Sequence, residues 1–120
     1  MKHVRTFLSI EAIAFGLAAL VHAGVLIGGY QHREARIAES LIAGVLALGL
    51  AVSLASPHLS RPAGLAAQGF ALLGTSVGIL AIAVGVGPQS LFDIVLHGGF
   101  ITLLIAGLTV VARHRPPVPS

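Results

Sequence analysis

Four apolar runs, each close to the length of a membrane span, constrain this sequence more than any other feature. They cover residues 7–29, 37–55, 65–86 and 91–112. A helix needs roughly 20 apolar residues to cross the hydrocarbon core of a bilayer. Inside that core each backbone N–H and C=O must bond within its own segment, and this requirement favours helices. The sequence therefore predicts an all-α chain with four membrane-spanning helices.

The segments between the runs are short and unlike one another. "YQHREAR" is charged, "SPHLSRP" holds two prolines and "GVGPQS" is a Gly-Pro turn. Connections this short favour antiparallel neighbours, so we expect an up-down four-helix bundle. One four-span domain over residues 1–112 is predicted, with a tail over residues 113–120 that is too short and proline-rich to fold.

The composition agrees with a lipid environment and excludes several kinds of site. Hydrophobic residues make up 56% of the chain and charged residues 9%, whereas soluble domains carry roughly 25% charged residues. The lipid bilayer is therefore the first partner that we expect. The chain has no cysteine, which excludes disulfides, thiolate metal sites and haem attached through CxxCH. It also has no basic stripe with interleaved aromatic residues, so nucleic acid is not a predicted partner.

Positive charge predicts the orientation. Most cationic residues fall at one end of the predicted bundle: Lys2, Arg5, Arg61, Arg113 and Arg115. The other end has only Arg33 and Arg36, partly offset by Glu34. The positive-inside rule then places both termini in the cytoplasm. We expect a cell-membrane protein, of a bacterial plasma membrane.

The first run also resembles a secretory signal that would be cleaved after Ala23. This alternative is less favoured, because Glu11 interrupts the apolar stretch and apolar residues continue to Ile27.

Two histidines interrupt the first and fourth runs at similar predicted depths. At about 1.5 Å per residue, His22 lies roughly 10 Å below Gly29, and His97 lies roughly 10 Å below Ser90. The first and fourth helices of an up-down bundle are neighbours, so the two rings could face each other. Asp93 is one helical turn from His97 on the same face.

The remaining polar side chains extend this arrangement to two levels. Glu39, near the start of the second run, belongs with the histidines at an outer level, although Arg36 is an alternative partner for it. Glu11 and Gln68 fall at an inner level, where they could share a hydrogen bond. Ionisable groups inside a membrane usually face the bundle interior and often mark a function.

Haem b or a single metal ion is the cofactor that this pattern predicts. Two histidines on facing helices suit axial ligation of a haem that needs no cysteine. Small residues after each histidine would leave room for the macrocycle, and arginines could contact propionates. The residues expected beside a haem are His22, His97, Gly24, Gly98, Gly99, Arg33 and Arg36. A metal ion would be held by His22, His97, Asp93 and Glu39. Either cofactor would serve electron transfer.

Two other interpretations stay open. The histidines could be structural, bonding to Asp93, to a backbone carbonyl or to each other. Alternatively, the chain could be a proton-coupled small transporter in which Glu11, Glu39 and Gln68 carry the proton pathway. A four-span chain with an acidic residue in its first helix is similar in size to small multidrug-type exporters. It differs from them in having few aromatic residues.

Partners and catalysis are less strongly indicated. The pairs Gly24/Gly28 and Gly74/Gly78 form GxxxG patterns, which favour close helix contact in a tight bundle or a homo-oligomer. Apolar helix faces would also suit a structural or accessory subunit of a larger membrane complex. No nucleophile–histidine–acid arrangement or phosphate-binding loop is present, so an enzyme is not expected.

Overall fold

The computed structural model of the chain describes residues 1–115 and 118. Its elements are α1 (Lys2–His22), α2 (Arg33–Ala55), the short 3-10 helix η1 (Pro57–Leu59), α3 (Ser60–Ala83) and α4 (Leu91–Arg113). No strand occurs in these described residues, and four helices are long and apolar enough to cross a membrane. The predicted all-helical class is confirmed. The prediction for the tail falls partly on residues 116, 117, 119 and 120, which lie outside the described residues.

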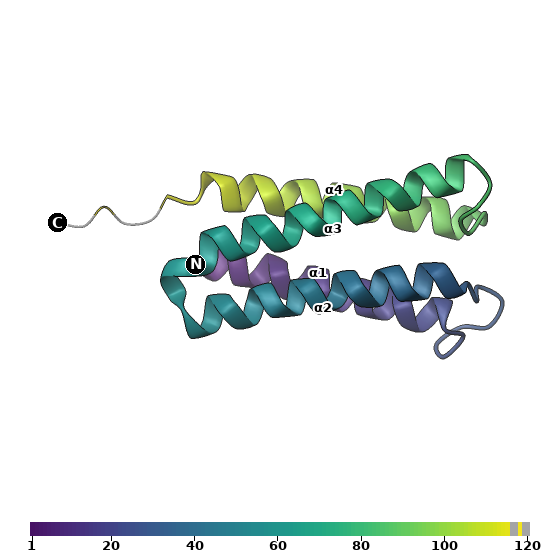
Figure 1. Cartoon of the computed structure of the whole chain (residues 1–120), viewed down its shortest axis with the longest axis horizontal. Coiled ribbons are helices and arrows are strands. Elements are labelled where there is room, and N and C mark those ends of the chain that lie inside the picture. The colour runs from purple at the N-terminus through teal and green to yellow at the C-terminus, as the bar shows by residue number, and fades with distance from the viewer. Residues whose placement is uncertain (116–117, 119–120) are drawn as a thin grey trace.

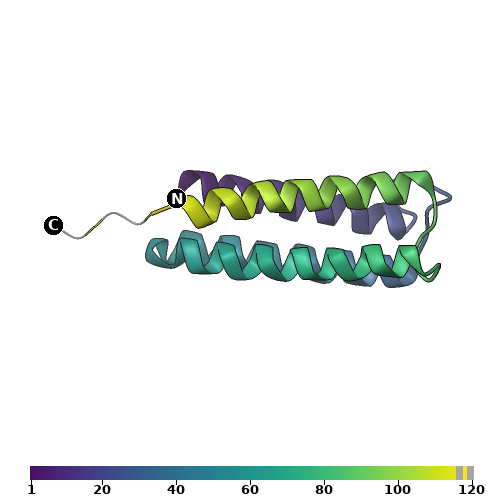
Figure 2. The same cartoon turned by 90° about the horizontal axis from the view of Figure 1, so that it is seen from above.

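The four long helices lie side by side around a common core (Figures 1 and 2). Each helix contacts the next in the chain, and α1 also contacts α4. The amino terminus lies at the same end of the bundle as the end of α4 (Figure 1). We call this end, with residues 1–5, 56–61 and 112–115, the inner end. The opposite end, with residues 23–32 and 84–90, is the outer end.

Helix α1 ends well before the predicted span does. Gly24 has a φ of 78°, and its N–H donates to the carbonyl of Val21 at 3.0 Å. Val25 N–H donates to the carbonyl of Leu20, also at 3.0 Å. A glycine in the left-handed region with such bonds is a common helix terminator. The apolar residues 25–27 therefore belong to the outer connection, and so do Gly24 and Gly28 of the first GxxxG pattern.

Local capping sets the starts of α2 and α4. His32 accepts a hydrogen bond from Ala35 N–H at 3.2 Å, so α2 begins before the predicted span does. Ser90 Oγ accepts from Asp93 N–H at 3.1 Å and starts α4 at the predicted position. These side chains satisfy N–H groups that have no partner within the helix.

The core is apolar, and so is most of the outer surface. Leu8, Leu46 and Leu104 are fully buried. The rings of Phe15 and Phe100 stack with centroids 4.1 Å apart in the middle of this core. Large apolar side chains also point outward on every helix: Ile13 (63% exposed), Leu48 (64%), Leu73 (66%) and Ile105 (51%). An apolar surface of this extent suits contact with lipid.

Glycines allow the helices to approach closely. A Cβ at Gly49 would lie 2.8 Å from the Cβ of Ala67, and one at Gly64 would lie 3.0 Å from Val4 Cγ1. Gly74 and Gly78, the second predicted GxxxG pattern, face Ile42 of α2 and His97 of α4. This pattern therefore serves packing within one chain.

Candidate functional site

Three buried ionisable side chains from three helices meet near the outer end, and we call them the outer polar cluster. His22 of α1 lies between Glu39 of α2 and Asp93 of α4. Its Nδ1 is 2.7 Å from Glu39 Oε2, and its Nε2 is 2.7 Å from Asp93 Oδ1. The exposed fractions are 1% for His22, 4% for Glu39 and 3% for Asp93. One imidazole therefore links three helices through short, buried hydrogen bonds.

The ends of two helices position this cluster. His22 is the last residue of α1, and its carbonyl accepts from the N–H of His32 at 3.0 Å. The outer connection thus returns to the end of α1. Asp93 lies in the first turn of α4, where its Oδ2 accepts from Ser90 Oγ. A carboxylate at a helix amino terminus is stabilised by the helix dipole.

The hydrogen bonds fix the number of protons in the outer polar cluster. Each of the two short bonds needs one proton between an imidazole nitrogen and a carboxylate oxygen. An imidazolium between two carboxylates and a neutral imidazole beside one carboxylic acid contain the same protons. In both cases the net charge of the outer polar cluster is −1. A third proton or a cation is needed to neutralise the cluster, and an unneutralised charge away from water is costly.

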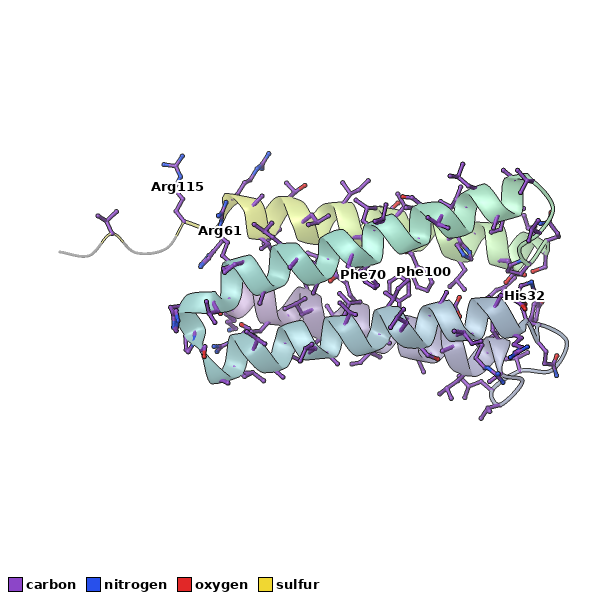
Figure 3. The ribbon with its side chains drawn as sticks, in the orientation of Figure 1. His32, Arg61, Phe70, Phe100 and Arg115 are labelled. Atoms are coloured by element: carbon purple, nitrogen blue, oxygen red, sulfur yellow. The ribbon has the colours of Figure 1, made fainter. Side chains whose placement is uncertain are left out.

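Only one carboxylate oxygen in this cluster is free to receive that positive charge. Glu39 Oε1 is buried and has no hydrogen-bond partner, whereas Glu39 Oε2 and both oxygens of Asp93 are engaged. Glu39 lines a cavity of about 400 Å³ that we call the outer cavity. Phe15 and Phe100 also line it, with His32 and Glu34 toward the outer end. Phe100 lies between the two pairs of helices in Figure 3, and His32 lies near the start of α2.

His97 lines the same cavity but takes no part in the side-chain hydrogen bonds of the outer polar cluster. Its Nδ1 donates to the backbone carbonyl of Asp93 at 2.7 Å. In the neutral ring, Nε2 then carries the lone pair. A Cβ added to Gly78 of α3 would lie 3.1 Å from this Nε2. The two histidines are therefore joined through Asp93, by its side chain on one side and its carbonyl on the other.

Glu11 and Gln68 form a second buried site deeper in the bundle, the inner polar pair. Gln68 Nε2 donates to both oxygens of Glu11 at 2.9 Å, and both residues are 0% exposed. The predicted hydrogen bond between them is confirmed. A Cβ at Gly107 would collide with both partners. The Phe15–Phe100 stack lies between this pair and the outer polar cluster, which are roughly 16 Å apart along α1.

Several residues predicted beside a cofactor lie elsewhere. Arg33 and Arg36 are exposed in the first turn of α2, and Gly98 and Gly99 are exposed on α4. Gly24 is in the outer connection. Glu39 pairs with His22 and not with Arg36.

The donors available for a metal ion are correspondingly few. Within residues 1–115 and 118, no group of three His, Cys, Asp or Glu side chains is arranged to hold a metal ion. Both nitrogens of His22 are engaged by carboxylates, so this imidazole offers no free lone pair. Of the two histidines predicted beside a cofactor, His97 is the one with a nitrogen available to a ligand.

Three residues of the site were not anticipated from the sequence. Ser90 stands three residues before Asp93, which is the spacing of an amino-terminal helix cap and could have indicated its role. Phe15 is four residues after Glu11, and Phe100 is three residues after His97. These spacings place both rings on the polar faces of their helices.

Fold and composition together indicate a small membrane protein with four helices that are long and apolar enough to span a membrane, and with a buried cluster of ionisable side chains. The chain matches no family model, no curated protein and no solved structure.

Proposed function

We propose that this multi-pass membrane protein binds a small organic cation in the outer cavity in exchange for a proton on Glu39, as a proton-coupled carrier does. The observation that carries the proposal is the buried Glu39 Oε1, which has no partner and belongs to a residue that lines the cavity. Glu39 Oε2 is bonded to His22 at 2.7 Å, so the orientation of the carboxylate is fixed.

Competition for one oxygen supplies the coupling. The cluster without a third proton carries one negative charge, and either a proton or a bound cation neutralises it. Because the two cannot occupy Glu39 Oε1 together, each lowers the affinity for the other, and this linkage is reciprocal. His22 and Asp93 are positioning residues here, since they hold Glu39 through the imidazole and anchor it to α4.

The lining of the cavity indicates the chemical class of the cation. Ala38, Ile42 and Val77 present apolar surface, and the rings of Phe15 and Phe100 add aromatic surface. A cation near an aromatic face gains about 0.5–2 kcal/mol, more where water is excluded. A volume of about 400 Å³ falls within the range of small-molecule sites. These features favour a compact amine or quaternary ammonium group with an apolar body.

The inner polar pair is the second proton site of this proposal. Glu11 lies on the same face of α1 as His22, and Gln68 holds both its oxygens. The stacked rings of Phe15 and Phe100 separate the two levels. Transfer between them therefore requires these rings to move apart, as a gate in a carrier does.

The proposal includes the topology. We infer an up-down bundle with the inner end in the cytoplasm, because the cationic residues gather there. The outer cavity then opens toward the outside of the cell. A bacterial plasma membrane is the proposed location.

Calorimetry tests the exchange directly. The detergent-purified protein is titrated with benzyltrimethylammonium, which has no proton of its own to release, in two buffers of different protonation enthalpy. We expect about one proton to be released for each cation bound, because both occupy the same oxygen. Glu39→Gln should weaken binding about tenfold or more, which corresponds to at least about 1.4 kcal/mol, and should abolish proton release.

Glu34→Gln is the matched control, because Glu34 lines the same cavity but is exposed near the start of α2. This variant should bind the cation and release the proton as the parent does. Binding without proton release, or binding that Glu39→Gln leaves unchanged, would contradict the proposal.

Haem or a metal ion at His97 is a second candidate. The observation that favours it is the Nδ1–H bond to a carbonyl, which is how ligating histidines are commonly oriented. Protein purified from haem-replete cells should then show a Soret band that His97→Ala removes and His22→Ala does not. A colourless, metal-free protein would count against this candidate.

A further inference from the structure

The described part of the inner end, residues 1–5, 56–61 and 112–115, carries positive charge and has no Asp or Glu. The four acidic residues of the chain are Glu11, Glu34, Glu39 and Asp93. Two of these lie in the outer polar cluster, one is exposed near the start of α2, and Glu11 lies deep in the core. None of the ion pairs among the described residues involves Lys2 or Arg5. No carboxylate of residues 1–115 or 118 therefore pairs with the charge of these two residues.

A groove between α1 and α2 begins at these two cations. It has a volume of about 680 Å³, and Lys2, Arg5 and Thr6 line its inner part. Ile10, Leu50 and Leu54 also line it, and Ile10 and Leu50 lie deeper toward the centre of the bundle. Ile10 is 48% exposed and Leu54 is 58% exposed, so apolar side chains form its open flank. The groove thus changes from cationic to apolar along the helix axis.

The guanidinium of Arg5 is held in a fixed position at the head of the groove. Its Nη2 donates to the carbonyl of Ser53 at 2.6 Å, and its Nε donates to Ser53 Oγ at 3.2 Å. Ser53 Oγ is in turn bonded to Ser60 Oγ at 2.7 Å. Two of the five N–H donors of arginine are used in this way, and the others are available to an acceptor. Neutral serine oxygens position the charge without cancelling it.

We infer that this groove binds an anionic phospholipid, with its phosphate between Lys2 and Arg5 and an acyl chain along Leu54, Leu50 and Ile10. Charge complementarity selects the anionic headgroup, because phosphate accepts from a guanidinium and an ammonium at once. The apolar flank favours a lipid over free phosphate, because an acyl chain can pack against this flank and free phosphate cannot. This site is independent of the proposed cation exchange at the outer end.

A single reporter tests the inference, because the chain contains no tryptophan. Leu54→Trp places the sole indole in the groove, and the variant is reconstituted in mixtures of phosphatidylcholine and brominated phosphatidylglycerol. Bromine quenches the indole when the brominated lipid is in contact with it. We expect phosphatidylglycerol to bind about 25-fold more tightly than phosphatidylcholine, which is about fivefold, or roughly 1 kcal/mol, for each of the two cations.

Two controls separate the groove from general attraction to the inner end. Leu59→Trp lies at the same end beside other cations, and Leu73→Trp lies on the outward face of α3. Neither reporter should show the preference. If the Leu59→Trp reporter showed an equal preference for phosphatidylglycerol, the groove would not be the binding site. If the two lipids bound equally at the Leu54→Trp reporter, the inference of anionic lipid binding would be wrong.

Charge removal provides the second comparison. Lys2→Gln, combined with Leu54→Trp, should reduce the preference from about 25-fold to about fivefold, and Arg5→Gln should reduce it at least as much. Lys2 makes no side-chain hydrogen bond within the described residues, so this variant should fold even where Arg5→Gln does not. Excess inorganic phosphate should leave the quenching unchanged. A preference that is not reduced in Lys2→Gln, or that free phosphate abolishes, would contradict a phospholipid site.

Discussion

At the scale of single residues, His22 decides whether the outer polar cluster is stable. His22→Ala removes both short hydrogen bonds and leaves Glu39 and Asp93 facing each other without a cation. Losing one partner of a buried ionic network typically costs about 3–5 kcal/mol. Average hydrogen bonds within membranes contribute only about 0.6 kcal/mol, so the stranded charge dominates. We expect a loss of about 3 kcal/mol in unfolding measurements in detergent micelles.

His58→Ala is the control for this substitution, because His58 is exposed in η1 at the inner end. It should change the free energy of unfolding by no more than about 0.5 kcal/mol. Adding Glu39→Ala to His22→Ala should restore part of the loss, since it removes one of the stranded charges. If the two substitutions are simply additive, His22 does not act through Glu39.

The sequence predicted some of these contacts and missed others, for physical reasons. The bond between Glu11 and Gln68 followed from their shared inner level. The bond from His22 to Glu39 did not, because it depends on where α1 ends. Residues 25–27 are apolar and look like a continuing span, and only the positive φ of Gly24 ends the helix before them. An apolar pattern carries no signal for that change of backbone direction.

At the scale of helices, the turn at Gly24 that ends α1 can be tested by substitution. Gly24→Ala would force a side chain into the left-handed region and place its Cβ within 3.0 Å of the Gln31 side chain. We expect a loss of about 1–2 kcal/mol in the free energy of unfolding, from the backbone term alone. Gly28→Ala is the matched control, because nothing lies within 4 Å of its Cβ position and its φ is not positive. Equal effects of the two substitutions would show that this turn does not define the end of α1.

The packing of α4 against the inner polar pair gives a second prediction at this scale. Gly107→Ala would push a methyl group into Glu11 and Gln68. Overpacking of a buried site typically costs about 1–3 kcal/mol. Gly99→Ala on the same helix has open space around its Cβ position and should be neutral or slightly stabilising. Thermal unfolding of the two variants should therefore differ, with Gly107→Ala the less stable. Similar melting temperatures would contradict a tight contact at Gly107.

At the scale of the whole molecule, the distribution of polarity is more informative than the number of helices. Four apolar runs sufficed to predict four helices long and apolar enough to cross a membrane, because the thickness of a bilayer sets the length of such runs. What the helices enclose is layered along the bundle axis: the outer polar cluster, the Phe15–Phe100 stack and then the inner polar pair. Burial between the helices keeps each polar level out of contact with lipid, and the stacked rings separate one level from the other.

The layers have a direction in the membrane, and labelling can determine it. The chain lacks cysteine, so single substitutions report one position each. His58→Cys at the inner end and Gln89→Cys at the outer end are both exposed positions. With the inner end in the cytoplasm, a membrane-impermeant maleimide should label Gln89→Cys on intact cells and His58→Cys only after lysis. The reverse pattern would place the outer cavity on the cytoplasmic side, and the exchange at Glu39 would then draw its cation from the cell interior.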